Sequence, residues 1–271
     1  MSTYMHVFAT TQRMISPATL ESVRYWRWLL KFYTLRRLAG IVVKRPPIVL
    51  AAGAGAETLV QRLNRINTFA PTHSCRIMTR YGSDKGRSWH NYTTVYDALF
   101  RDCRPLRIFE LGLGTNNPEL PSTMGANGKP GASLRGWKRL FPAARIFGAD
   151  IDHATLFRED RINTFWCDQL DSSAIRDVWS KPELRGGIDV IVEDGLHTFE
   201  ANQTFLEISL HFVTRGGWYI VEDIRDVDLD HWRNWLDHDS QRFPSYQFVL
   251  IRLPNAFNHF DNNLLVAHRA S

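Results

Sequence analysis

Two acidic clusters follow neighbouring apolar runs, and they are the residues best suited to carry chemistry. The run Ile188–Val192 leads into Asp194, and the run Trp218–Val221 leads into Glu222 and Asp223. Each run is short and rich in β-branched or aromatic residues, which predicts a buried strand of a parallel sheet. Because ligands bind beyond the carboxyl ends of such strands, we expect the three acidic side chains to converge at one sheet edge.

Three carboxylates at one edge form a donor set for a hard cation. Mg²⁺ prefers oxygen ligands and leaves coordination positions for water or substrate. His197, three residues after Asp194, is then a candidate general base beside the metal. Glu193 is left out of the donor set because neighbouring residues of a strand point to opposite faces. A solvated strand end at Glu222 and Asp223, and a helix-capping role for His197, remain the alternatives.

A glycine-rich turn follows the first predicted strand, Arg107–Leu111. Glu110 lies near the end of this strand, and Gly112 and Gly114 follow it. Such a turn lets a nucleotide-like ligand approach the backbone, and the acidic side chain can accept hydrogen bonds from it. Glycines that only permit a tight turn between strand and helix are the alternative.

Polar side chains also end the next two strands. Asp150 ends the second, where a ribose diol would bind, and Asp168 and Gln169 follow the third, beside the expected adenine amino group. Together with Glu110 they favour S-adenosylmethionine over NAD, because the third glycine of the dinucleotide fingerprint is missing and a sulfonium cofactor has no pyrophosphate. A Rossmann dehydrogenase is the alternative for this half of the chain.

The elements that must position these residues alternate along the chain. Strands are predicted at residues 107–111, 144–149, 163–167, 188–192 and 218–221, and helices at 132–140, 172–179 and 198–211. This alternation predicts an α/β fold, a Rossmann-like doubly wound parallel sheet. A short polar loop joins residues 247–253 and 263–268, which predicts a C-terminal antiparallel hairpin.

The N-terminal residues form a separate section. A helical pattern from Pro17 to Leu38 ends before Pro46 and Pro47, so we expect a helical extension over residues 1–75. Its aromatic and basic residues fit a helix packed on the main domain or on a second subunit. An interfacial helix on an anionic membrane is the alternative.

Composition limits the protein class. The chain has 271 residues, 44% of them hydrophobic, and its net charge of +5 comes from 33 Lys and Arg against 28 Asp and Glu. The charges are mixed along the chain, so we expect no nucleic-acid partner. Three cysteines without metal-ligand spacing indicate free thiols in a reducing compartment. Neither a signal peptide nor an apolar run of about 18 residues is present, so we expect a cytoplasmic protein.

Four motifs together resemble a known family. The segment from Tyr81 to Lys85, the Glu110–Gly114 turn, the Asp194–His197 motif and the Glu222–Asp223 pair are similar to those of the metal-dependent sugar O-methyltransferases of macrolide biosynthesis. These are the mycinamicin and macrocin types, with the related cephalosporin hydroxylase-like group. The similarity covers roughly residues 80–268. It implies a class I S-adenosylmethionine-dependent methyltransferase domain over residues 76–271.

The resemblance also implies roles for individual residues. Asp194, Glu222 and Asp223 would bind Mg²⁺, and His197 would be the general base for a sugar hydroxyl. Ser83 and Lys85 precede the core and would contact the amino-acid end of the cofactor, with solvated turn charges as the alternative. The long loop over residues 116–130 is a candidate lid over the cofactor.

The expected function is therefore Mg²⁺- and S-adenosylmethionine-dependent O-methylation of a sugar hydroxyl on a glycosylated small molecule or glycan. Vicinal hydroxyls are the expected acceptors, because one metal ion can chelate both. Three alternatives stay open: a catechol-type O-methyltransferase, a hydroxylase-like or binding protein that keeps the fold and metal site, and a glycan-modifying enzyme at a membrane surface. Self-association is expected by analogy alone.

Overall fold

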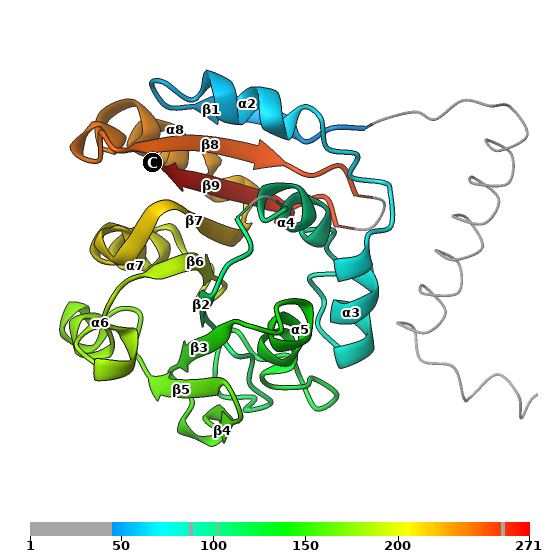
Figure 1. Ribbon diagram of the computed structural model, residues 1–271, viewed down its shortest axis with the longest axis vertical. Coiled ribbons are helices and arrows are strands. Elements are labelled where there is room, and N and C mark those ends of the chain that lie inside the picture. Colours follow the sequence, from blue (N-terminus) through cyan, green and yellow to red (C-terminus); the bar gives the residue numbers. More distant parts are fainter. Residues whose placement is uncertain (1–44, 87–88, 102, 256–257) are drawn as a thin grey trace, which may run out of the picture. The chain divides into compact units, whose positions relative to one another are not determined.

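The computed structural model describes residues 45–86, 89–101, 103–255 and 258–271 (Figure 1). The chain divides into two units, Met1–Val43 and Lys44–Ser271. The helix predicted over residues 17–38 lies outside the described residues. Among the described residues, no helix is both long and apolar enough to cross a membrane.

The described residues form one nine-stranded sheet in the order β1-β8-β9-β7-β6-β2-β3-β5-β4. Five strands, β2, β3, β5, β6 and β7, are mutually parallel, and β9 pairs antiparallel with both β7 and β8. The predicted parallel sheet with a C-terminal antiparallel hairpin is therefore confirmed. The strands are β1 (Ile48–Ala52), β2 (Arg107–Leu111), β3 (Arg145–Asp150), β4 (Arg158–Glu159), β5 (Ile162–Trp166), β6 (Ile188–Glu193), β7 (Val213–Ile224), β8 (Tyr246–Arg252) and β9 (Asn263–Arg269).

Helices cover both faces of this sheet (Figure 1). One face packs against α2 (Glu57–Leu63), α3 (His73–Tyr81), α4 (Thr93–Leu99) and α5 (Ala132–Leu140). The other face packs against α6 (Ser172–Trp179), α7 (Phe199–Ser209) and α8 (Leu229–His238). Each face has its own apolar core, which keeps the parallel strands buried on both sides.

Three details differ from the sequence prediction. Helix α7 begins at Phe199 because the Thr198 side chain accepts a hydrogen bond from the backbone N–H of Ala201 and caps the helix. Strand β7 extends beyond the predicted residues 218–221 because it continues through the Gly216–Gly217 pair with an irregular register against β6. Strand β1 pairs with β8, so residues 48–52 lie in the sheet although the predicted extension runs to residue 75.

Candidate functional site

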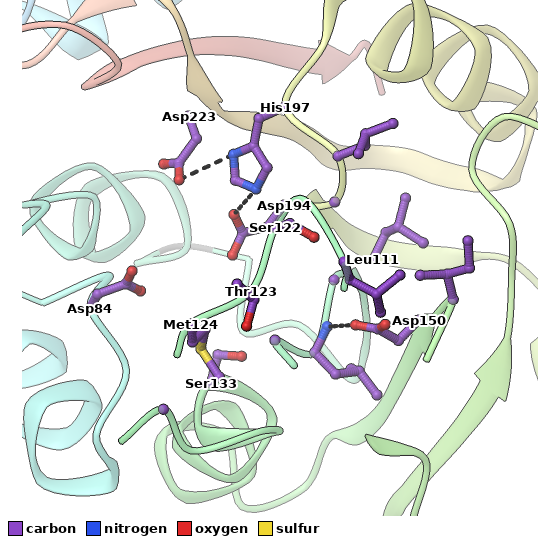
Figure 2. A pocket seen from close by; sticks show the side chains of 18 of the residues that line it. Asp84, Leu111, Ser122, Thr123, Met124, Ser133, Asp150, Asp194, His197 and Asp223 are labelled. Atoms are coloured by element: carbon purple, nitrogen blue, oxygen red, sulfur yellow. Dashed lines mark hydrogen bonds and ion pairs between the residues drawn. The ribbon is translucent and has the colours of Figure 1, made fainter. Parts of the chain in front are cut away.

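A cavity of about 790 Å³ opens at the carboxyl ends of the parallel strands, a volume typical of ligand pockets (Figure 2). Its wall contains the turn after β2, the ends of β3 and β5, and the loops after β6 and β7. All predicted site residues line it except Glu110 and Glu222. Those that line it are Ser83, Lys85, Gly112, Gly114, Asp150, Asp168, Gln169, Asp194, His197 and Asp223.

The glycine turn after β2 packs directly on the loop after β6. Gly112 has a φ of +86°, and a Cβ atom at this position would lie 1.8 Å from the backbone oxygen of Asp194. In turn, the backbone N–H of Asp194 donates to the carbonyl of Leu111 at 2.9 Å. Only glycine allows this approach. The turn predicted to bind the cofactor therefore contacts the backbone of Asp194, a predicted metal ligand.

Asp150 fixes the same turn from the neighbouring strand. One carboxylate oxygen accepts the backbone N–H of Leu113 at 2.7 Å, and the other accepts that of Asp152 at 2.9 Å. Burial raises the pKa of Asp150 above its usual value, although the backbone N–H groups oppose this shift. Asp150 therefore supports the turn, and it also lines the cavity where a ribose was predicted.

Gln169 connects the end of β5 with the loop after β6. Its side-chain oxygen accepts the backbone N–H of Leu196 at 2.8 Å, and its nitrogen donates to Glu193 at 2.8 Å. Glu193 is buried against α7, on the opposite side of the strand from Asp194. Both ends of the Gln169 amide are therefore occupied within the protein. Asp168, which is only partly buried, is left to face the cavity.

Glu110 points away from the cavity. It alternates with Phe109 and Leu111, so its side chain lies on the sheet face that packs against α5. There its carboxylate accepts hydrogen bonds from the Ser133 hydroxyl and the Trp137 indole N–H. Its side chain is fully buried. The structure thus places Glu110 beneath the N-terminus of α5 rather than on the cavity wall.

Asp194, His197 and Asp223 form a cluster in the cavity wall (Figure 2). One potential ligand atom from each lies within 4.8 Å of the others. Asp223 Oδ2 is 3.2 Å from His197 Nδ1, and Asp194 Oδ1 is 3.8 Å from His197 Nε2. Each of the three side chains keeps partial exposure, between 15% and 26%, so a ligand in the cavity can reach them.

Backbone strain marks two members of this cluster. His197 and Asp223 have φ values of +62° and +52°, in the left-handed region that non-glycine residues seldom adopt. Strain of this kind costs about 1–3 kcal/mol per residue and concentrates at functional sites. The fold therefore holds both side chains toward the cavity at an energetic cost.

Two aromatic side chains that precede α4 hold Asp223. The Tyr92 hydroxyl donates to Asp223 Oδ1 at 2.5 Å, and His90 Nε2 lies 3.5 Å from the same oxygen. His90 was not predicted from the sequence. Tyr92 is among the residues that carry the family resemblance, but its contact with Asp223 was not predicted. Burial tends to raise the pKa of Asp223, but His90 and His197 outweigh it, so this pKa lies below its usual value.

The pKa of His197 moves in the opposite direction. Burial lowers it, but the hydrogen bond to Asp223 and the charges of Asp223 and Asp194 outweigh burial and raise it to about 9. Burial also raises the pKa of Asp194 to about 7, against the opposing effect of the Lys85 ammonium.

Glu222 is turned from the cavity toward α4. Its carboxylate accepts hydrogen bonds from the Tyr96 hydroxyl and the Lys85 ammonium, and only 1% of its side chain is exposed. Of the three predicted metal ligands, the structure brings Asp194 and Asp223 together with His197, and it places Glu222 behind them.

Lys85 lies among carboxylates. Its ammonium donates to both Asp194 and Glu222 and is 3.5 Å from Glu110. Burial lowers the pKa of Lys85, but these three carboxylates outweigh burial and raise it well above its usual value.

The residues fit the two predicted ligands. Two carboxylates on the wall of a polar cavity suit Mg²⁺, which proteins commonly bind through one or two carboxylates plus waters. The glycine turn, Asp150 and Asp168 line one cavity at the strand ends, which suits a nucleoside. Trp232 and Trp235 are buried in the core beneath α8, so they do not form a surface for stacking a sugar.

The fold is that of the class I methyltransferases. No family model matches the chain. A solved structure with this fold is the MycE methyltransferase of the mycinamycin biosynthetic pathway in complex with Mg and SAH. It shares 22% identity and a TM-score of 0.56 with this chain, over 80% of this chain and 61% of that one.

Sequence similarity points to sugar methyltransferases. The 8-demethyl-8-(2-methoxy-alpha-L-rhamnosyl)-tetracenomycin-C 3'-O-methyltransferase of Streptomyces olivaceus is 34% identical over 61% of this chain. The 8-demethyl-8-alpha-L-rhamnosyl tetracenomycin-C 2'-O-methyltransferase of the same organism is 31% identical over 68% of this chain. The matches cover 40% and 45% of these relatives, so the chain spans less than half their length. The resemblance predicted from the motifs is confirmed.

Proposed function

We propose that this protein is an S-adenosylmethionine-dependent, Mg²⁺-dependent O-methyltransferase that acts on a sugar hydroxyl of a glycosylated small molecule or glycan. The observation that carries the proposal is the meeting of Asp194, His197 and Asp223 at the wall of the cavity that the Gly112 turn closes. Similarity to two rhamnose O-methyltransferases supports the sugar acceptor.

In this proposal Asp194 and Asp223 hold the metal ion, with Glu222 as the third predicted ligand. A bound divalent cation would act as a Lewis acid and lower the cost of deprotonating an acceptor hydroxyl. Two adjacent hydroxyls of a sugar fit this role because they can be held together, which fixes the orientation of the attacking oxygen.

His197 is the proposed general base. Its Nδ1 lies 3.2 Å from Asp223, so in the neutral imidazole Nδ1–H donates a hydrogen bond to this carboxylate and the Nε2 lone pair is available. Nε2 is then the atom that would accept the proton of the acceptor hydroxyl. The cofactor would supply the methyl group to that oxygen and leave as S-adenosylhomocysteine. The positive charges of the bound cation and of the sulfonium oppose the raised pKa of His197 and favour its neutral form.

The cofactor is proposed to contact the backbone of the Gly112–Gly114 turn. Its ribose would bind Asp150, and its adenine amino group would bind Asp168. Ser83 is proposed to contact the amino-acid end of the cofactor. Residues 116–130 contribute to the same cavity, with Met124 against Gly114, which supports a covering role for this loop.

We also propose a cytoplasmic location, which is supported by three free cysteines. Peripheral membrane contact through the basic N-terminal segment and self-association stay predictions.

The test is methyl transfer from S-adenosylmethionine, followed by mass spectrometry of the acceptor. A rhamnosylated aromatic compound with free vicinal hydroxyls is compared with a catechol, each with Mg²⁺ and with EDTA. We expect methylation of the sugar only, and only with Mg²⁺. Preferential methylation of the catechol would favour the catechol-type alternative, and cofactor binding without transfer to either acceptor would favour a non-methylating protein.

The variant His197→Gln separates the base from the binding residues. We expect kcat to fall by about 10²–10⁴-fold, the usual contribution of a general base. Affinity for S-adenosylmethionine, measured by calorimetry, should change little. The matched variant Asp194→Asn should instead lose Mg²⁺ binding. An active His197→Gln variant would exclude His197 as the base.

A further inference from the structure

The side chain of Lys85 occupies the space between the predicted metal ligands. Only 2% of it is exposed, and its ammonium donates to Asp194 and Glu222 at once. It comes from the connection between α3 and α4, far from either acidic residue in sequence. A fixed monovalent cation therefore lies at carboxylates that a divalent cation would need.

The three carboxylates around Lys85 differ in what else holds them. Glu110 is bonded by Ser133 and Trp137, and Glu222 by Tyr96, all within the protein. Asp194 has no second donor of this kind among the described contacts of its side chain. Its other carboxylate oxygen, Oδ1, faces the cavity and lies 3.8 Å from His197 Nε2.

Asp194 is thus shared between Lys85 on its buried side and the cavity on its open side. A cation that enters the cavity has to bind the same carboxylate whose charge Lys85 already neutralises. Two cations on one carboxylate repel each other strongly in a buried site, where screening by water is weak. Lys85 has an alternative partner nearby, because Glu110 lies 3.5 Å from its ammonium.

We propose that Lys85 is an internal competitor of the divalent cation. It holds Asp194 and Glu222 together, keeps Glu222 out of the cavity, and weakens metal binding at Asp194 and Asp223. This inference rests on the proposed function, because it takes these residues as the metal site. It differs from the role predicted for Lys85 from sequence, contact with the cofactor carboxylate.

The test compares Mn²⁺ affinity of the full chain with that of Lys85→Met and Lys85→Arg, by electron paramagnetic resonance of free Mn²⁺. Methionine keeps the unbranched side chain and removes the charge, whereas arginine keeps the charge. We expect Lys85→Met to bind Mn²⁺ at least tenfold more tightly than wild type. Lys85→Arg should stay within about threefold of wild type, and affinity for S-adenosylmethionine should be unchanged in Lys85→Met.

Thermal unfolding supplies a second readout. Without divalent cations, Lys85→Met should melt below wild type, because the buried carboxylates lose their counter-charge. Saturating Mn²⁺ should raise its melting temperature more than that of wild type, as linkage between binding and folding requires. If the variant folds only with Mn²⁺ present, the proposal is also supported.

Three results would overturn the inference. In the first, folded Lys85→Met binds Mn²⁺ no more tightly than wild type. In the second, the variant stays unfolded at saturating Mn²⁺. In the third, it loses affinity for S-adenosylmethionine by tenfold or more, which would assign Lys85 to the cofactor. Wild type that binds no Mn²⁺ would instead overturn the proposed function itself, so the two failures are distinguishable.

Discussion

At the scale of single residues, the site is a set of charges balanced by buried neighbours. Asp223 accepts a hydrogen bond from Tyr92 and lies 3.5 Å from His90, and its pKa is lowered because the nearby histidines outweigh burial. Asp194 has Lys85, yet burial still raises its pKa to about 7. Adjacent positions on one wall of the cavity therefore differ in how readily they carry negative charge, and the difference comes from their neighbours rather than from their own chemistry.

The tyrosines of α4 and its N-terminus provide a matched pair of variants. Tyr92 supports Asp223, which lines the cavity, whereas Tyr96 supports Glu222, which does not. Because a hydrogen bond to a charged group contributes about 1.5–3 kcal/mol, we expect Tyr92→Phe to weaken Mn²⁺ binding by roughly tenfold or more. Tyr96→Phe should change it by less than about threefold. Equal losses in calorimetric titration would show that Glu222 is an equal ligand.

Metal affinity should depend on pH through Asp194. Its pKa of about 7 is raised above the usual value, so the carboxyl group gains a proton as the pH falls through 7. A protonated carboxyl group is a poor ligand, so affinity should fall by up to about tenfold per unit below pH 7. We expect Mn²⁺ titrations from pH 5.5 to 8 to show this loss on the acid side. Affinity that stays constant over this range would contradict the raised pKa.

At the scale of elements, the site depends on how strand ends and turns meet. The turn after β2 contacts the loop after β6 at Gly112, and Gln169 ties the end of β5 to that same loop. Sequence alternation predicts which residues follow each strand, since strand ends are marked by a change from apolar to polar residues. It does not predict the direction of Glu110 and Glu222, because their partners Ser133, Trp137 and Tyr96 come from helices elsewhere in the chain.

Two glycines with similar backbone conformations test this contact. Gly112→Ala places a Cβ against the Asp194 backbone, whereas Gly55→Ala, at a φ of +73°, has no atom within 4 Å. We expect Gly55→Ala to lower the free energy of unfolding by about 1–2 kcal/mol, the cost of the left-handed conformation. Gly112→Ala should cost at least about 1–3 kcal/mol more and abolish binding of S-adenosylmethionine. Denaturant unfolding and calorimetry measure both, and equal stabilities of the two variants would count against the close approach.

At the scale of the whole molecule, every predicted site residue lies between Ser83 and Asp223, within the unit that the structure describes. The described residues of the two apolar cores on the faces of the sheet also belong to this unit. The basic N-terminal segment, for which packing on the main domain or on a second subunit was predicted with membrane contact as the alternative, lies outside the described residues.

Removal of residues 1–44 should therefore leave a folded protein. We expect its affinity for S-adenosylmethionine to stay within about threefold of the full chain, because the cores and the cavity are retained. Circular dichroism and calorimetry provide the measurement. Sedimentation of both forms with anionic vesicles tests membrane contact, which predicts binding by the full chain only. A truncated chain that is insoluble, or that no longer binds the cofactor, would show that residues 1–44 support the domain.

The sequence by itself determined the parallel sheet, the C-terminal hairpin, and the glycine and acidic residues at the strand ends, because these follow from local periodicity and from the alternation of elements along the chain. Only the tertiary structure decided that Lys85 lies between Asp194 and Glu222, that Glu222 points to α4, and that His90 and Tyr92 hold Asp223. The physical reason is that burial and pairing of a charge depend on side chains brought together from distant segments. The spacing of residues within one segment does not predict those contacts.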